Sequence, residues 1–422
     1  MENLDEKIRN IVKYAYKNVP SYRNKMIKMG ISPNDIKGQD DMKYLPFMDK
    51  EDFRENYPYG LFAVPKDKII RVHSTSGTTG ISSLVGFTKE DWERQCYLTS
   101  IVGKMAGIEE KDIVQIVYGF GMFTGGIGWL EGLENIGSLV IPIGPGNTKK
   151  QIEYLKHLKT SVLIGTPSYI LHLAEYIKNN TDIDITRDLN VKKILVGGEI
   201  LTENIREIIK KSWQINNVTQ NYGFCEGGGA GISGECVFQN GMHITDEYYP
   251  ELIDPVTCEN LENGQTGEIV FTTLSKKGLP LIRYRTHDIT SLYYEKCDCG
   301  IEGYKMSTIL GRSDSMLKIK GVCVFPRRIE EIILQDGICS PNYEIILETK
   351  DYIDYVTLKI EFNGPITNYT KDFMDVYSQN LRKKIKEEVG INVNISFVEV
   401  GTLERFEGKA KRVKDLRFSR RI

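Results

Sequence analysis

The first segment of the chain carries apolar residues at three- and four-residue spacing, at Ile8, Ile11, Val12, Ala15 and Val19. This spacing places the apolar side chains on one face of a helix, and Pro20 predicts where that helix ends. Asp49 precedes a short charged segment and is predicted to cap a second helix. The chain is therefore expected to open with helices.

From residue 70 onward, short apolar runs alternate with longer segments of helical spacing. The runs cover residues 113–117, 139–143, 162–164 and 194–196. The helical segments include residues 89–105 and 203–213. Strands that alternate with helices predict an α/β layer architecture with a largely parallel sheet. Residues 242–294 instead hold several short strands with glycine-containing turns, which predicts an antiparallel subdomain or barrel.

A smaller unit begins after Gly311. One predicted helix begins after Pro326, and a second covers residues 371–389. The predicted strands cover residues 343–347, 355–362 and 393–400. This mixture indicates a separate α+β domain of about 110 residues, within the usual size range of domains. The predicted fold class is therefore α/β, with a large N-terminal domain (residues 1–312, parallel-rich sheets plus a β-rich subdomain) and a small α+β C-terminal domain (residues 313–422).

The composition excludes several classes of protein. The chain has 422 residues with 55 basic and 57 acidic side chains, so its net charge of −2 offers no general basic surface for nucleic acid. Its polar start, MENLDEKIRN, predicts no secretory signal, and no apolar run of about 18 residues predicts a membrane span. Eight cysteines are too sparse for a disulfide scaffold, so we expect a cytoplasmic protein.

The clearest local feature is a glycine- and hydroxyl-rich segment at residues 73–80, which reads His-Ser-Thr-Ser-Gly-Thr-Thr-Gly. Its backbone N–H and side-chain O–H groups are of the kind that surround phosphate oxygens. A polar surface turn is an equally good interpretation of these eight residues alone. The segment is not a GxxxxGK[ST] loop, because no lysine follows the second glycine.

Four further segments hold chemistry-bearing residues. Residues 222–226 (YGFCE) stand at the end of a predicted strand, and Asp288 supplies a carboxylate after an aromatic residue. Residues 311–314 (GRSD) lie at the predicted domain boundary, and residues 408–412 (GKAKR) place Lys409 in a glycine-bounded loop. In order and spacing these segments resemble the adenylate-forming superfamily, and most closely its phenylacetate–CoA ligase group. The resemblance extends over nearly the whole chain and includes the segments KNVPSYR, YGFGMFTGGIGW, LIRYRTHDIT and GRSDSMLKIKGVCVFPRRIEE.

The resemblance implies an ATP-dependent ligase that joins an aromatic carboxylic acid to coenzyme A through an acyl-adenylate, with release of AMP and pyrophosphate. It implies that Tyr222 stacks on adenine, that Asp288 binds the ribose hydroxyls and that Glu226 holds Mg²⁺. Lys409 would be catalytic and would stabilise charge at the α-phosphate, with Asp314 as the hinge of a mobile small domain. The nucleotide-binding residues it implies are Ser74, Thr75, Ser76, Gly77, Thr78, Thr79, Gly80, Gly198, Glu199, Asn221, Tyr222, Gly223, Cys225, Asp288 and Arg312.

Two further sites are predicted. An aromatic acid would lie in a flat slot lined by Tyr118, Phe123, Gly125 and Gly197, although ordinary core packing explains the same residues. Three thiols and an imidazole form a familiar tetrahedral zinc set, and a similar arrangement in some relatives adds to the expectation of a structural Zn²⁺. Buried or exposed free thiols stay the alternative. The zinc residues are Cys236, His243, Cys297 and Cys299.

The chain departs from the family pattern at two positions near the nucleotide. Ile81 and Ser82 replace the usual Lys-Pro after the phosphate loop, and Cys225 replaces a hydroxyl residue. A thiol is a poor hydrogen-bond donor, so these changes favour weaker ATP binding. Two alternatives stay open. The first is an enzyme that passes the acyl group to a carrier protein or an amine, which the sequence scarcely separates from a CoA ligase. The second is a catalytically silent nucleotide or acyl binder, which Ile81 and Cys225 suggest. A homodimer is also left open.

Overall fold

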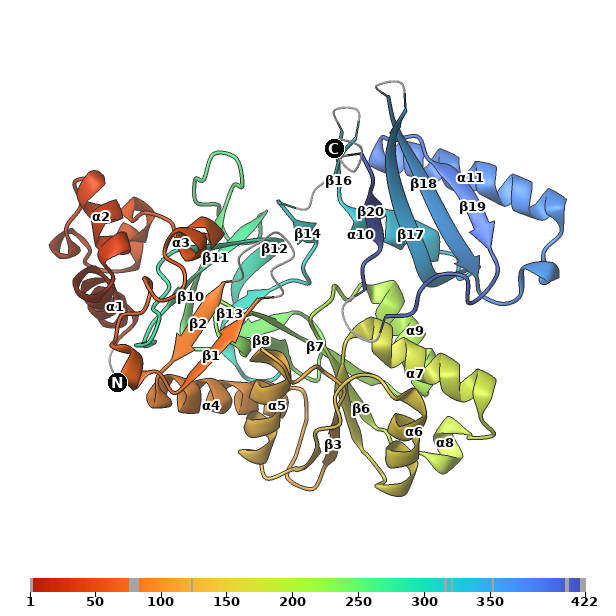
Figure 1. The fold of residues 1–422 in the computed structure, drawn as a ribbon, viewed down its shortest axis with the longest axis horizontal. Helices are drawn as coiled ribbons and strands as arrows, with labels where there is room; N and C mark the ends of the chain where they lie inside the picture. The colour runs from red at the N-terminus through yellow and green to blue at the C-terminus, as the bar shows by residue number, and fades with distance from the viewer. Residues whose placement is uncertain are drawn as a thin grey trace.

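The protein has a large N-terminal part and a smaller C-terminal part that lies beside helices α7 and α9 (Figure 1). The computed structural model describes residues 3–75, 83–122, 124–314, 317–319, 322–350, 353–406 and 410–417. Within these ranges, no helix is long and apolar enough to cross a membrane. The predicted α/β class is confirmed.

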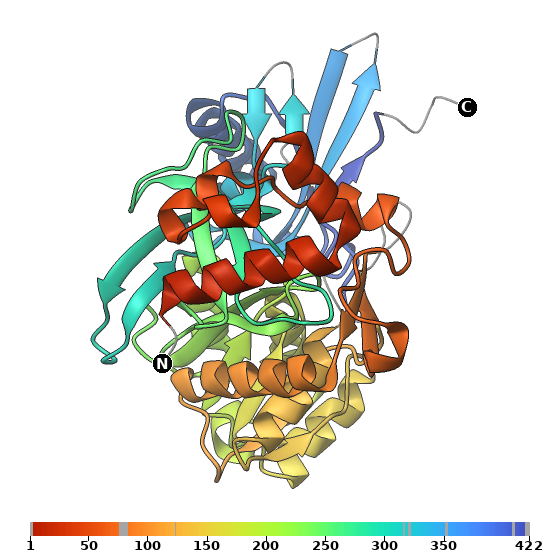
Figure 2. The same cartoon turned by 90° about the vertical axis from the view of Figure 1, so that its left-hand side faces the viewer.

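Helices open the chain, as predicted. They are α1 (Leu4–Asn18), α2 (Pro20–Lys28) and α3 (Lys50–Glu55), with short 3-10 helices at Pro33–Asp35, Gln39–Tyr44 and Lys66–Lys68. Asp49 caps α3, because its side chain accepts hydrogen bonds from the N–H groups of Glu51 and Asp52. Pro20 does follow the end of α1, but it is also the first residue of α2, where its missing N–H costs nothing. Figure 2 shows α1 lying across the strands of the large part.

A parallel sheet forms the centre of the large part. Its strands run in the order β4 (Leu139–Ile141), β3 (Ile113–Ile116), β5 (Val162–Gly165), β6 (Lys193–Val196) and β7 (Asn217–Phe224). Helices between the strands are α4 (Lys89–Met105), α5 (Thr124–Glu134), α6 (Thr148–His157), α7 (Pro167–Asn180), α8 (Ile185–Asp188) and α9 (Glu203–Trp213). Both faces of the sheet are covered, because Val162 and Ile164 pack into one core and Leu163 into another. Burial on both faces explains the continuous apolar runs.

The sheet continues from β7 into an antiparallel region, which confirms the prediction for residues 242–294. Its strands are β8 (Gly229–Glu235), β9 (Met242–Ile244), β10 (Tyr248–Ile253), β11 (Thr266–Thr273), β12 (Tyr284–Lys296), β13 (Glu302–Met306) and β14 (Gly311–Arg312). They do not form a separate closed barrel. Among the described residues, strands β3 to β14 form one open 12-stranded sheet with β10 and β4 at its edges.

A two-stranded hairpin, which the sequence did not indicate, leads to the glycine-rich loop. Strands β1 (Arg71–Ser74) and β2 (Leu84–Phe87) pair antiparallel, with Ser74 opposite Leu84. Each strand has four residues, too few for a convincing alternation of apolar and polar positions. The pairing of Ser74 with Leu84 therefore fixes the positions of the two ends of the loop.

The C-terminal part is an α+β unit, as predicted. Its elements are β15 (Leu317–Ile319), β16 (Val322–Val324), α10 (Pro326–Leu334), β17 (Cys339–Lys350), β18 (Ile353–Phe362), a 3-10 turn (Ile366–Asn368), α11 (Lys371–Val389), β19 (Asn394–Val398) and β20 (Val413–Asp415). Four strands form a sheet in the order β19-β18-β17-β20. Ile345 and Leu358 of this sheet are buried with Ile385 of α11 in one core.

Candidate active site

Three residues predicted to serve the nucleotide form one hydrogen-bonded group. The hydroxyl of Tyr222 donates to Oδ2 of Asp288 at 2.7 Å, and Nη1 of Arg312 donates to Oδ1 at 2.9 Å. The β12–β14 register places Asp288 directly opposite Arg312. Arg312 also binds both carboxylate oxygens of Asp314, at 2.8 and 2.7 Å. The residues predicted for adenine, ribose and hinge are therefore physically connected.

Burial and charge set the protonation of this group. Burial raises the pKa of the Tyr222 hydroxyl well above its usual value, and the charge of Asp288 raises it further. Burial alone would raise the pKa of Asp314, but its hydrogen bonds to Arg312, together with the charges of Arg312 and Lys50, outweigh burial and hold that pKa below its usual value. At neutral pH the tyrosine is therefore a hydrogen-bond donor and Asp314 is charged.

Glu226 follows β7 in a turn, and its side chain is buried with 3% exposure. Its Oε1 atom has no hydrogen-bond partner within the described part of the chain. Burial, and then the charge of Glu226, raise the pKa of the Tyr284 hydroxyl well above its usual value. A buried carboxylate oxygen that lacks a donor is suited to a hard cation such as Mg²⁺. The position of Glu226 thus fits its predicted role.

Lys276 is a buried neighbour of Glu226 that the sequence did not predict. Its Nζ donates to the backbone oxygen of Glu226 at 3.2 Å and lies 4.6 Å from the centre of the Phe87 ring. Burial lowers the pKa of Lys276 to about 8. Burial likewise raises the pKa of the neighbouring Cys225 thiol to about 12, so that thiol is neutral. Lys276 stands in the polar segment Ser-Lys-Lys-Gly, where the sequence gives no sign that one of the two lysines is buried.

The predicted acyl slot has a crowded side and an open side. A Cβ atom on Gly197 would lie 2.6 Å from Nδ2 of Asn221, so no side chain fits there. The Tyr118 hydroxyl is buried, and burial raises its pKa. A Cβ atom on Gly125, in the first turn of α5, would meet no atom of the described residues within 4 Å. Phe123 lies outside the described residues. The aromatic slot stays a prediction.

Several predicted nucleotide contacts are already engaged with protein. Asn221 donates from Nδ2 to the Val196 carbonyl at 3.1 Å. A Cβ atom on Gly223 would lie 2.0 Å from the Gly229 oxygen, so the close approach of β7 and β8 accounts for this glycine. Gly198 has a φ of 77°, a conformation that also favours glycine. Their roles toward ATP stay predictions.

Glu199 likewise has protein partners on both carboxylate oxygens. Its Oε2 accepts the Ser168 N–H at 3.0 Å, and its Oε1 accepts the Ser168 hydroxyl at 2.8 Å. Oε1 also accepts the backbone N–H of Ala410, in the C-terminal part, at 2.5 Å. Glu199 therefore connects the two parts of the molecule.

The phosphate loop and the predicted catalytic lysine are only partly placed. Ser74 and Thr75 are described: the Ser74 N–H donates to Met122 O at 2.9 Å, and the Thr75 hydroxyl accepts the Ser83 N–H at 3.0 Å. Ser76, Gly77, Thr78, Thr79, Gly80 and Lys409 lie outside the described residues. The Thr75 hydroxyl thus closes the base of the loop.

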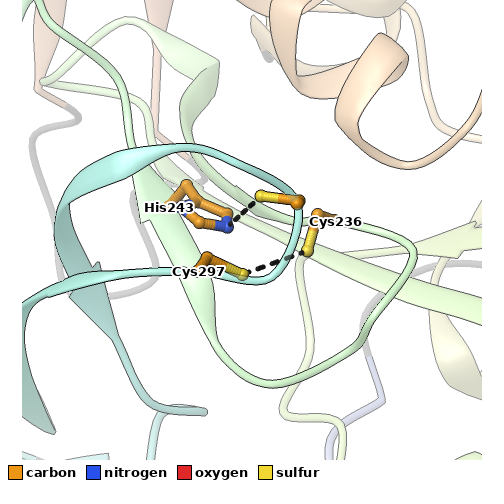
Figure 3. Close-up of side chains that lie close together, drawn as sticks. Cys236, His243 and Cys297 are labelled. Carbon is orange, nitrogen blue, oxygen red and sulfur yellow. Dashed lines mark hydrogen bonds between the residues drawn. The ribbon is translucent and has the colours of Figure 1, made fainter.

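The four predicted zinc residues come together between β8, β9 and the β12–β13 turn, and Figure 3 shows three of them with side chains pointing toward one another. Their ligand atoms all lie within 4.8 Å of one another. The Cys236 and Cys297 sulfurs are 3.8 Å apart, and the Cys299 sulfur is 3.4 Å from Nε2 of His243. A tetrahedral zinc with Zn–S bonds of about 2.3 Å would place two sulfurs about 3.8 Å apart. The geometry therefore fits zinc.

Comparisons with known proteins agree with this architecture. Residues 31–275 match the model of the AMP-binding enzyme family, and residues 321–417 match the AMP-binding enzyme C-terminal domain. The chain is 39% identical to a phenylacetate-coenzyme A ligase of Pseudomonas putida over 98% of this chain and 93% of that protein. It is 36% identical to the Escherichia coli K12 protein of the same name, over 98% and 94%.

A solved structure shares the fold. A 2-hydroxyisobutyryl-CoA ligase in its postadenylation state has a TM-score of 0.89 and 23% identity, covering 97% of this chain and 88% of that chain. The matches in sequence decide the family: the chain belongs to the AMP-binding, adenylate-forming enzymes, and within them it is a phenylacetate–CoA ligase-like protein.

Proposed function

We propose that the protein is an ATP-dependent ligase that joins an aromatic carboxylic acid, such as an arylacetate, to coenzyme A. Its first step makes an acyl-adenylate and releases pyrophosphate, and its second makes the thioester and releases AMP. The observation that carries the proposal is the similarity to four phenylacetate-coenzyme A ligases, at 35–39% identity over 98% of the chain. The Tyr222–Asp288–Arg312 group supports it, because it offers a charged acceptor for ribose hydroxyls.

The chemistry of the carboxylate explains why these residues are needed. A carboxylate repels nucleophiles and lacks a good leaving group, and adenylation supplies AMP as that group. Asp288 would orient the nucleotide through the ribose, and Glu226 would hold Mg²⁺, which neutralises phosphate charge when bound. Lys409 would stabilise the charge that develops between the attacking carboxylate and the α-phosphate. Removing Lys409 should therefore affect adenylation alone.

The two parts of the chain would take different arrangements for the two steps. We place the boundary between residues 312 and 313, with Asp314 as the hinge that Arg312 holds. The postadenylation form of 2-hydroxyisobutyryl-CoA ligase gives a TM-score of 0.89, against 0.70 for the thioesterification form of that protein. This difference supports assigning the present arrangement to the adenylation half of the cycle.

The test is pyrophosphate exchange into ATP with a panel of arylacetates and benzoates, followed by product analysis with and without coenzyme A. We expect acid-dependent exchange and a coenzyme A thioester as the product. Exchange without a thioester would favour a carrier protein or an amine as acceptor. No exchange with any acid would favour a silent binder and refute the ligase.

We also propose that Cys236, His243, Cys297 and Cys299 hold a structural Zn²⁺. Its support is the sulfur separation of 3.8 Å and the burial of Cys236 and His243, each with 2% exposure. The metal would join the start of the β8–β9 connection to the β12–β13 turn. Cys297→Ser should lower the zinc content of the purified protein and its melting temperature. Unchanged zinc content would refute the site, and Cys258→Ser is the matched control.

A further inference from the structure

The segment on either side of Lys409 is anchored twice within the small domain. At its start, Glu361 is 0% exposed and accepts the N–H groups of Gly401 and Leu403 at 3.1 and 2.9 Å. It also binds the Arg405 guanidinium, at 2.7 Å from Nη2. At its end, Arg412 pairs with Glu330 of α10 at 3.0 Å. These contacts lie inside one domain, so they persist if that domain turns as a unit.

The large domain touches the same segment at two described points. Glu199 accepts the Ala410 N–H at 2.5 Å, and Glu175 of α7 lies 3.4 Å from the Arg405 guanidinium. Both contacts cross between domains, so any rotation of the small domain breaks them. The Glu175–Arg405 pair is long and partly exposed, and such pairs contribute little. The Glu199 contact is short and charge-assisted, so it is the stronger of the two.

The partners of Glu199 argue against direct contact with ATP. Its two oxygens already accept three hydrogen bonds, two from Ser168 and one from Ala410. An acidic side chain beside phosphates would repel them unless a cation intervened. A carboxylate held in place by Ser168 is instead suited to receive a backbone N–H that arrives with the small domain.

We propose that Glu199 is a positioning residue, which seats the segment that carries Lys409 against the large domain during adenylation. The proposal rests on the proposed function and on the role of Lys409 in it. Ala410 is the next residue after that lysine, so a hydrogen bond at its N–H fixes the backbone beside the charged side chain. The hydrogen bond between Glu199 and Ala410 breaks when the small domain rotates for thioester formation.

The test separates the two half-reactions in the full-length enzyme. Glu199→Leu should lower kcat for pyrophosphate exchange about 10- to 100-fold, the value of one lost charge-assisted hydrogen bond. Its KM for ATP should stay within about twofold, and thioester formation from supplied acyl-adenylate and coenzyme A should be unchanged. Glu199→Gln keeps an acceptor oxygen and should retain most of the exchange rate. Glu175→Gln, which weakens only the exposed pair, is the matched control and should lose less than about threefold.

Each outcome decides the matter. A KM for ATP that rises with the loss in rate would make Glu199 a nucleotide ligand and overturn the proposal. Equal loss of both half-reactions in Glu199→Leu and Glu199→Gln would make its role structural and overturn it as well. If Glu199→Leu does not fold, the comparison is made with Ser168→Ala, which loosens Glu199 and should lose exchange while it spares thioester formation. Failure of the proposed function is distinguishable, because the wild-type enzyme would then show no exchange at all.

Discussion

Asp288→Asn is the sharpest perturbation of the nucleotide group, because it removes a charge without changing the size of the side chain. The carboxylate is 11% exposed and binds Tyr222 and Arg312 at 2.7 and 2.9 Å. An amide presents one acceptor oxygen and one NH₂ donor. Arg312 would keep both hydrogen bonds to Asp314, so no buried cation is left unpaired.

The magnitude follows from the kind of bond that is lost. A hydrogen bond to a charged group contributes about 1.5–3 kcal/mol, against about 0.5–1.5 for a neutral pair. Asp288→Asn should lose one ribose bond and weaken the other, so ATP binding should weaken by about 2 kcal/mol. That free energy corresponds to a rise in KM for ATP of about 30-fold. Loss of the Asp288–Arg312 pair should cost about 1 kcal/mol of folding stability, because the arginine side chain is partly exposed.

The assay is pyrophosphate exchange at saturating acid with ATP varied, together with ATP binding measured by calorimetry. Tyr222→Phe is the matched control, because it removes one hydrogen bond to Asp288 and keeps the aromatic ring. It should raise KM for ATP by less than about tenfold. A KM for ATP within twofold of wild type in Asp288→Asn would refute the ribose assignment. A large fall in kcat at unchanged KM would also contradict it.

Three further results are expected. Lys409→Ala should abolish pyrophosphate exchange but still bind ATP and make thioester from supplied acyl-adenylate, and equal loss of both half-reactions would count against a catalytic lysine. Gly125→Leu should raise KM for the aromatic acid by about tenfold or more without changing KM for ATP, because its side chain enters space that no described residue fills. An unchanged KM for the acid would show that Gly125 does not line the acyl slot. Burial would raise the pKa of Glu268, but hydrogen bonds with His287 and Arg285 lower it from 4.5 to about 2. Its stabilising contribution is therefore complete above pH 4.5 and lost as the pH falls toward 2, so Glu268→Gln should flatten acid unfolding measured by circular dichroism over this range.

Elements with strong local signals were predictable from the sequence. Helices α4 and α9 have the predicted bounds, because each combines helical spacing with a threonine cap, Thr88 or Thr202. Strand β20 was missed because its three residues lie in a basic tail and pair with β17, far away in the chain. Pairing over such distances has no signal in local periodicity.

The residues of the candidate site were also only partly predictable from the sequence. Asp288 and Glu226 stand in recognisable segments, and the structure places both as buried carboxylates. Lys276 and the partners of Glu199 could not be foreseen, since their positions depend on tertiary contacts between distant segments. The cluster of Cys236, His243, Cys297 and Cys299 was predictable because cysteine and histidine are rare in this chain.

Strand β7 serves two kinds of strand pairing along its length. Its residues 217–220 pair parallel with β6, and its residues 221–224 pair antiparallel with β8. The same short stretch of backbone therefore sets the alignment of both halves of the sheet. Inserting or deleting one residue here would turn Tyr222 to the opposite face and carry Asn221 away from Val196. An insertion or deletion that a loop would tolerate is therefore excluded within this strand.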